Sequence, residues 1–74
     1  MLFRSDSNMD LTIWLYLINV ENHPDSWKTH YDLAYVYKEK GEILLSKNAL
    51  QKAEELNPGN ADVSKLLNEV NNME

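Results

Sequence analysis

The segment 27–58 constrains the fold most, because it reads as two helices joined by a very tight turn. The first helical pattern ends at Lys40 and the second begins at Glu42. Gly41 between them can adopt the left-handed conformation that ends a helix. Pro58 cannot continue the second helix, since it lacks a backbone N–H. The segment therefore predicts an antiparallel helical hairpin.

Each helix of this hairpin has one side suited to packing. The packing positions of the first helix include Leu33, Ala34 and Tyr37. The second helix presents a stripe of four packing positions: Ile43, Ser46, Leu50 and Ala53. Positions three and four residues apart lie on the same helical face. Because Ala34 is small, we expect the two backbones to approach closely there.

One further helix is expected on each side of the hairpin. Residues 10–22 read as a helix that is apolar on nearly all sides, and Pro24 ends it. A strand is the alternative, since this segment is rich in β-branched and aromatic residues, but no partner strand is visible elsewhere in the chain. Asn60 can cap a last helix, over 61–72, with one apolar and one polar face. The predicted fold class is all-α, with about four helices.

Composition narrows the choice of partners. The 74 residues suffice for one small domain, and 43% hydrophobic with 26% charged residues is an ordinary globular composition. The net charge of −5 disfavours nucleic acid and anionic membrane surfaces. The absence of Cys excludes disulfides and thiolate sites. The longest apolar run is far shorter than the ~20 residues of a membrane span.

Nothing in the sequence indicates catalysis, a cofactor or a metal. His23 and His30 lack the spacing of a metal site, and we expect both to be loop or surface residues. Asp25 and Ser26 lie near them and resemble a catalytic triad superficially, but no oxyanion loop accompanies them. Ser26 is better explained as a helix cap. We therefore expect a protein that is not an enzyme.

An internal repeat organises the chain. Its period is the separation between Pro24 and Pro58, which we call the repeat offset. At this offset, some positions carry residues of similar size and polarity: Tyr16 and Leu50, Thr12 and Ser46, Leu33 and Leu67. Other positions do not: Asn19 and Ala53, Tyr37 and Asn71. The chain is predicted to hold the second helix of one repeat (10–22), a full repeat (25–58) and a capping helix (60–73).

This pattern resembles the tetratricopeptide repeat family, whose repeats are about 34 residues long. The residues that match its motif are Leu33, Ala34, Tyr37, Gly41, Ile43, Ser46, Leu50, Ala53 and Pro58. The resemblance implies helix hairpins stacked as a short solenoid, and a protein–protein interaction or scaffold function. Ala34 departs from the usual glycine and Ser46 from the usual alanine, and Asn68 and Asn71 suit a terminal helix with no further repeat to cover.

A narrower resemblance gives an alternative function. The junction 22–27, followed by Tyr31, Tyr37 and Gly41, is similar to the short tetratricopeptide tail of some bacterial serine hydrolases, either esterase-like or β-lactamase and penicillin-binding-like. This resemblance implies a structural or oligomerising tail of a larger enzyme. None of the hydrolase motifs is present, so no catalytic residue is carried over.

A candidate peptide groove lies along one side of the first hairpin helix. Its predicted residues are Lys28, Tyr31, Tyr35 and Lys38, with Asp62, Lys65 and Glu69 from the last helix. The resemblance implies that this side builds the inner surface of the superhelix. Tyrosines are enriched at binding hot spots. Alternatively, both tyrosines pack against neighbouring helices.

The helix over 10–22 has more apolar surface than one neighbour can cover. We expect Leu11, Trp14, Leu15 and Ile18 to face the hairpin, which leaves Ile13, Leu17 and Val20 facing outward. Large apolar patches seldom stay open to water. The chain is therefore predicted to lack its native N-terminal partner and, when alone, to self-associate through this helix.

The first nine residues are predicted to be disordered or not native. Residues 2–5 match one reading frame of a common sequencing adapter. No export signal is visible, so the compartment is unknown and cytoplasmic by default.

Overall fold

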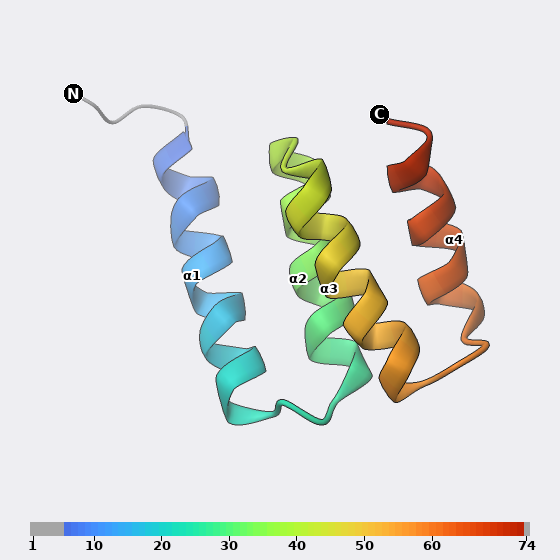
Figure 1. The fold of residues 1–74 in the computed structure, drawn as a ribbon. Helices are drawn as coiled ribbons and strands as arrows, with labels where there is room; N and C mark the ends of the chain where they lie inside the picture. Colours follow the sequence, from blue (N-terminus) through green and yellow to red (C-terminus); the bar gives the residue numbers. More distant parts are fainter. Residues whose placement is uncertain (1–5, 74) are drawn as a thin grey trace.

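The chain folds into helices that follow one another as antiparallel hairpins (Figure 1). The computed structural model describes residues 6–73, and within them the elements are α1 (Asp6–Asn22), α2 (Trp27–Lys40), α3 (Ile43–Leu56) and α4 (Ala61–Asn71). Each helix packs on the one before it, and α2 also touches α4. The predicted all-α class with four helices is confirmed for the described residues. No helix among them is both long and apolar enough to cross a membrane.

The turn between α2 and α3 forms as the sequence predicts. Gly41 has a φ of 89°, in the left-handed region that glycine adopts without a steric penalty. Its N–H donates to the Lys38 carbonyl at 3.0 Å, and the N–H of Glu42 donates to the Tyr37 carbonyl at 2.9 Å. These two bonds are the Schellman pattern, which satisfies carbonyls at the end of α2. The chain thus reverses within two residues.

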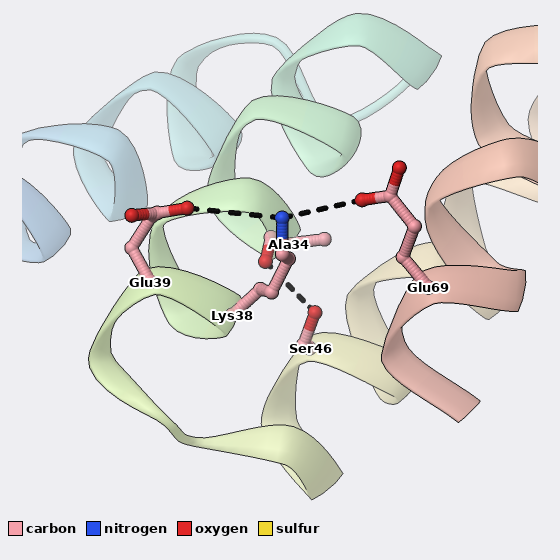
Figure 2. Close-up of polar contacts among 5 residues, drawn as sticks. All are labelled: Ala34, Lys38, Glu39, Ser46 and Glu69. Atoms are coloured by element: carbon pink, nitrogen blue, oxygen red, sulfur yellow. Dashed lines mark hydrogen bonds and ion pairs between the residues drawn. The ribbon is translucent and has the colours of Figure 1, made fainter. Parts of the chain in front are cut away.

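A buried contact of the hairpin joins Ala34 on α2 and Ser46 on α3. Both residues have no exposed surface. The Ser46 Oγ donates a hydrogen bond to the Ala34 carbonyl oxygen at 2.8 Å, as Figure 2 shows. Two small side chains let the backbones approach, and the hydrogen bond satisfies the only polar group of Ser46's side chain.

The main core surrounds this contact. It joins α2, α3 and α4 through seven buried side chains: Ala34, Ala49, Leu50, Ala53, Val63, Leu66 and Val70. Among the predicted packing residues, Tyr37 and Ile43 are half-buried, and Pro58 is exposed in the loop before α4. That loop ends at Asn60, whose Oδ1 accepts from the N–H of Val63 at 3.1 Å, so Asn60 caps α4 as predicted.

A second, smaller core joins α1 to α2. Its buried members are Ile13, Leu33 and Val36, and the half-buried residues packed against them are Met9, Tyr16, Val20 and Tyr37. An ion pair between Asp10 and Lys40 also links the two helices. Among the described elements, α1 packs on α2 alone.

The face of α1 that packs on α2 is opposite to the predicted one. Ile13 is buried and Val20 packs against the second core, whereas Leu11, Trp14 and Leu15 are exposed. Because α1 carries apolar stripes on both sides, periodicity could not choose between them. The choice depends on Val36, which is buried against α1 but is not a packing position predicted from the sequence. Of the three residues predicted to face outward, Ile13, Leu17 and Val20, only Leu17 is exposed.

The connection between α1 and α2 corrects the prediction for His30. His30 is buried rather than on the surface, and its Nε2 lies 3.0 Å from the Pro24 carbonyl oxygen. Ser26 occupies the cap position of α2, but its side chain makes no capping hydrogen bond. Instead, the Thr29 Oγ1 donates to the carbonyls of Ser26 and His23, at 2.9 and 3.1 Å. Backbone carbonyls, rather than a capping side chain, therefore hold this loop on α2.

The first helix begins at Asp6, earlier than the predicted Asp10 and close to Ser7, the alternative start that the sequence offers as a cap. The predicted disordered or non-native segment 1–9 therefore overlaps α1 over residues 6–9. Its remaining residues, 1–5, lie outside those that the structure describes.

The tight packing of the hairpin can be tested at Ala53, which has no exposed surface. We expect Ala53→Phe to lower the free energy of unfolding by about 1–3 kcal/mol, because a well-packed core must distort to admit a ring. Urea denaturation followed by circular dichroism measures this change. Gln51→Phe, on the exposed side of the same helix, should change stability far less. Equal effects of the two variants would contradict the packing.

Candidate functional site

A shallow groove lies between α2 and α4. Its volume is about 240 Å³, and its lining residues are Tyr31, Tyr35, Asp62, Lys65, Leu66 and Glu69. The first two come from α2 and the other four from α4. The groove therefore exists only because α3 holds these two helices next to each other.

Local structure explains why these side chains meet. Both α2 and α4 run antiparallel to α3, so they run in the same direction (Figure 1). Tyr31 and Tyr35 are four residues apart on α2, and Lys65 and Glu69 are four apart on α4. Residues four apart stack on one face of a helix. Two matching pairs thus face a common groove.

Tyr31 forms the buried part of the groove wall. It is half-buried against the main core, and its ring meets the Trp27 ring edge to face, with 5.8 Å between centroids and 65° between planes. Burial raises the pKa of the Tyr31 hydroxyl, and the Asp62 carboxylate raises it further. The hydroxyl therefore remains protonated near neutral pH and can donate a hydrogen bond.

Tyr35 forms the accessible part, since 46% of it is exposed. The Lys38 Nζ lies 5.0 Å from the centroid of its ring, within the range of a cation–π contact. The sequence left open whether the two tyrosines line a groove for a ligand or pack against neighbouring helices, and the structure places them differently. Tyr31 packs against its neighbours, whereas Tyr35 presents its ring to solvent.

Lys38 ties α2 to α4 at one end of the groove. Its Nζ lies 3.2 Å from the Glu69 Oε1 and 3.7 Å from the Glu39 Oε2, and Figure 2 shows it between the two carboxylates. The hydrogen bond to Glu69 raises the pKa of Lys38. Lys38 therefore lies beside the groove and orients Glu69, rather than lining the groove itself.

Lys28 also lies outside the groove lining. Its Nζ is 3.0 Å from the Asp32 Oδ1 and 5.7 Å from the centroid of the Tyr31 ring. The hydrogen bond to Asp32 raises the pKa of Lys28. Five of the seven predicted groove residues thus line the groove, while Lys28 and Lys38 lie beside its tyrosine rings. That any of them binds a ligand stays a prediction.

One lining residue, Leu66, was not predicted. It belongs to the apolar face of α4 and is almost fully buried, at 3% exposure, so it forms the floor of the groove. Its only sequence signal is the apolar periodicity of α4, which indicates the core. That signal gives no reason to place one core residue at the edge of a groove.

The charges of the groove are mixed. Glu69 is paired with Lys38, whereas Asp62 and Lys65 form no ion pair among the described residues. The groove therefore offers a carboxylate and an ammonium group for a ligand, beside two phenol rings. No group of three His, Cys, Asp or Glu side chains that could hold a metal occurs in the described part of the chain.

A second hollow, of about 420 Å³, belongs to the last residue of α1 and the loop that follows it. Its lining residues are Asn22, His23, Pro24, Asp25 and Ser26. They follow one another in the sequence, and no other element contributes to the lining. His30 makes its hydrogen bond to the Pro24 carbonyl rather than to Ser26. This hollow brings together no side chains from separate elements, so we take the α2–α4 groove as the candidate site.

Comparisons with protein-family models, with curated proteins and with solved structures found no match for this chain. What is established is a small all-α domain of four helices within the described residues.

The Lys38–Glu69 ion pair should contribute to stability in a pH-dependent way. Because the folded state raises the pKa of Lys38, this contribution is fully present below the ordinary value of 10.5 and is lost as pH rises through the raised value. We expect Glu69→Gln to lower the free energy of unfolding by roughly 0.2–1 kcal/mol at pH 8, and less in high salt. The difference from the wild type should vanish at strongly alkaline pH.

Chemical denaturation of both proteins at pH 8 and above pH 11 measures this difference. Glu21→Gln, which removes a carboxylate from the exposed end of α1, is the matched control. A difference between wild type and Glu69→Gln that stays constant through alkaline pH would show that Lys38 does not stabilise Glu69.

Proposed function

We propose that this chain is a non-catalytic protein-interaction module of the tetratricopeptide type. The groove between α2 and α4 would bind a segment of another protein. One observation carries the proposal: groove residues on the two helices are equivalent in the repeat. Lys65 follows Tyr31 by the repeat offset. Glu69 follows Tyr35 by the same offset.

The helix boundaries support the same repeat. The last residues of α1 and α3, Asn22 and Leu56, are separated by the repeat offset. The first residues of α2 and α4, Trp27 and Ala61, are separated by the same offset. In this scheme α2 and α4 are the first helices of successive repeats, and the resemblance to the tetratricopeptide family assigns the inner surface to such helices.

The chemistry of the groove suits a peptide. The exposed ring of Tyr35 offers contact area at low cost in side-chain entropy. Asp62 can accept hydrogen bonds from backbone N–H groups, and Lys65 can donate to carbonyl or carboxylate oxygens. A groove of about 240 Å³ accommodates only a few side chains. We therefore expect micromolar or weaker affinity, because the contact is far smaller than the roughly 1,600 Å² of a standard interface.

The raised pKa values of Tyr31, in the groove, and of Lys38, beside it, support a non-catalytic role. General acid–base catalysis favours groups whose pKa lies near the working pH. The pKa values of Tyr31 and Lys38 are both raised, which moves them further from neutrality. The alternative function, a tail of a larger serine hydrolase, stays a prediction from the sequence.

A random peptide library displayed on phage, selected against the immobilised chain, can test this proposal. We expect Tyr35→Ala to weaken a selected peptide roughly tenfold, since truncating a hot-spot tyrosine typically costs more than ~1 kcal/mol. Lys65→Glu should change which peptides bind, because it reverses the charge of the groove. Isothermal titration calorimetry measures both effects.

Leu44→Ala is the matched control. Leu44 is 72% exposed on α3 and does not line the groove. The Leu44→Ala substitution should therefore leave peptide affinity unchanged. Amide shifts of the wild type on titration should cluster around Tyr31, Tyr35 and Lys65. Selected peptides that bind all three variants equally, or a library that yields no binder, would overturn the proposal.

A further inference from the structure

Asp62 is the carboxylate of the groove that has no ion pair among the described residues. It lies in the first turn of α4, where the helix dipole stabilises a negative charge. Its carboxylate also contributes to the raised pKa of the Tyr31 hydroxyl, which shows that the two groups lie close together. The groove thus presents an unpaired negative charge beside an aromatic ring.

Both tyrosine rings of the groove already attract cations of the chain itself. The Lys38 Nζ lies 5.0 Å from the centroid of the Tyr35 ring, and the Lys28 Nζ lies 5.7 Å from the centroid of the Tyr31 ring. Such contacts use the negative face that an aromatic ring offers to a cation. Each lysine Nζ also lies within 3.2 Å of a carboxylate oxygen, so its charge is compensated and repels a further cation only weakly.

The charge around the groove favours a positive ligand group. Carboxylates in the groove and beside it outnumber ammonium groups by four to three: Asp32, Glu39, Asp62 and Glu69 against Lys28, Lys38 and Lys65. The whole chain carries a net charge of −5. A positive group is therefore attracted at long range and meets an unpaired carboxylate inside the groove.

We propose that the segment bound in this groove carries an arginine whose guanidinium pairs with Asp62 and packs against the tyrosine rings. This inference rests on the proposed peptide binding and names the side chain that the groove selects. Arginine fits better than lysine, because its planar guanidinium stacks on aromatic rings and donates two parallel hydrogen bonds to one carboxylate. Lys65 then donates to a carbonyl oxygen of the bound backbone, which requires no charge on the peptide.

Three phage libraries that differ only in one fixed central residue, arginine, glutamine or glutamate, can be selected against the immobilised chain. We expect the arginine library to be enriched most and the glutamate library least. Equal or greater enrichment of the glutamine or glutamate library would overturn this inference and leave the proposed peptide binding standing. The absence of binders from all three libraries would overturn both.

A selected arginine peptide can then be compared with its citrulline form, which keeps the shape of the side chain and loses its charge. Isothermal titration calorimetry should show roughly three- to tenfold weaker binding of the citrulline form, the combined scale of an exposed ion pair and a cation–π contact. Equal affinity of the two peptides for the wild type would overturn the inference.

Asp62→Asn tests the assignment to this carboxylate, because it removes the charge and keeps the size of the side chain. The variant should reduce the preference for the arginine form to about twofold, the part that the rings supply at an exposed site. Circular dichroism should show wild-type helicity. An arginine preference as large as that of the wild type, with helicity retained, would overturn the role of Asp62.

Glu21→Gln is the matched control for net charge. It removes one carboxylate, as Asp62→Asn does, but from the exposed end of α1 and outside the groove. The control should keep the full preference for the arginine form. An equal loss of preference in Glu21→Gln and Asp62→Asn would show that the net charge of the chain, rather than the groove, selects arginine, and would overturn the inference.

Discussion

The contact between Ala34 and Ser46 is the constraint on which the rest of the structure depends. Both residues are fully buried, and the hydrogen bond of 2.8 Å between them fixes how close α2 and α3 lie. Protein cores are packed at nearly crystalline density, so a larger side chain at either position would separate the helices. The main core extends from this contact to Leu50 on α3 and to Val63 on α4. The spacing of α2 and α4 across the groove is thus set by two small residues that do not line it.

Different sides of α2 serve different neighbours. Leu33 and Val36 pack toward α1, and Ala34 packs against α3. Tyr31 and Tyr35 face α4 across the groove. A helix used on so many sides has little freedom to rotate, because each turn contributes to more than one contact. This fixed orientation explains why a shallow groove can still present its side chains in a defined arrangement.

Local signals made the hairpin and the groove predictable, whereas the orientation of α1 was not. Gly41 and Asn60 act on their own helix ends, and Tyr31 and Tyr35 share a side of α2 whatever surrounds them. The side of α1 that packs inward depends on Val36, which is distant in sequence. His30 is buried because a loop carbonyl, that of Pro24, meets its ring. Contacts of this kind join residues from different elements, so the sequence of one element alone does not predict them.

The groove and the outer side of α1 should behave independently, although α2 contacts the elements that form both. Energetic coupling between two sites needs an element with two arrangements that both sites bias. Between the outer side of α1 and the groove lie the second core around Ile13 and the main core around Leu50, to which α2 contributes from different sides. The Schellman turn at Gly41 and the ion pair of Lys38 with Glu69 hold α2 against its neighbours in one arrangement. A peptide in the groove should therefore leave the α1 side of the molecule unchanged.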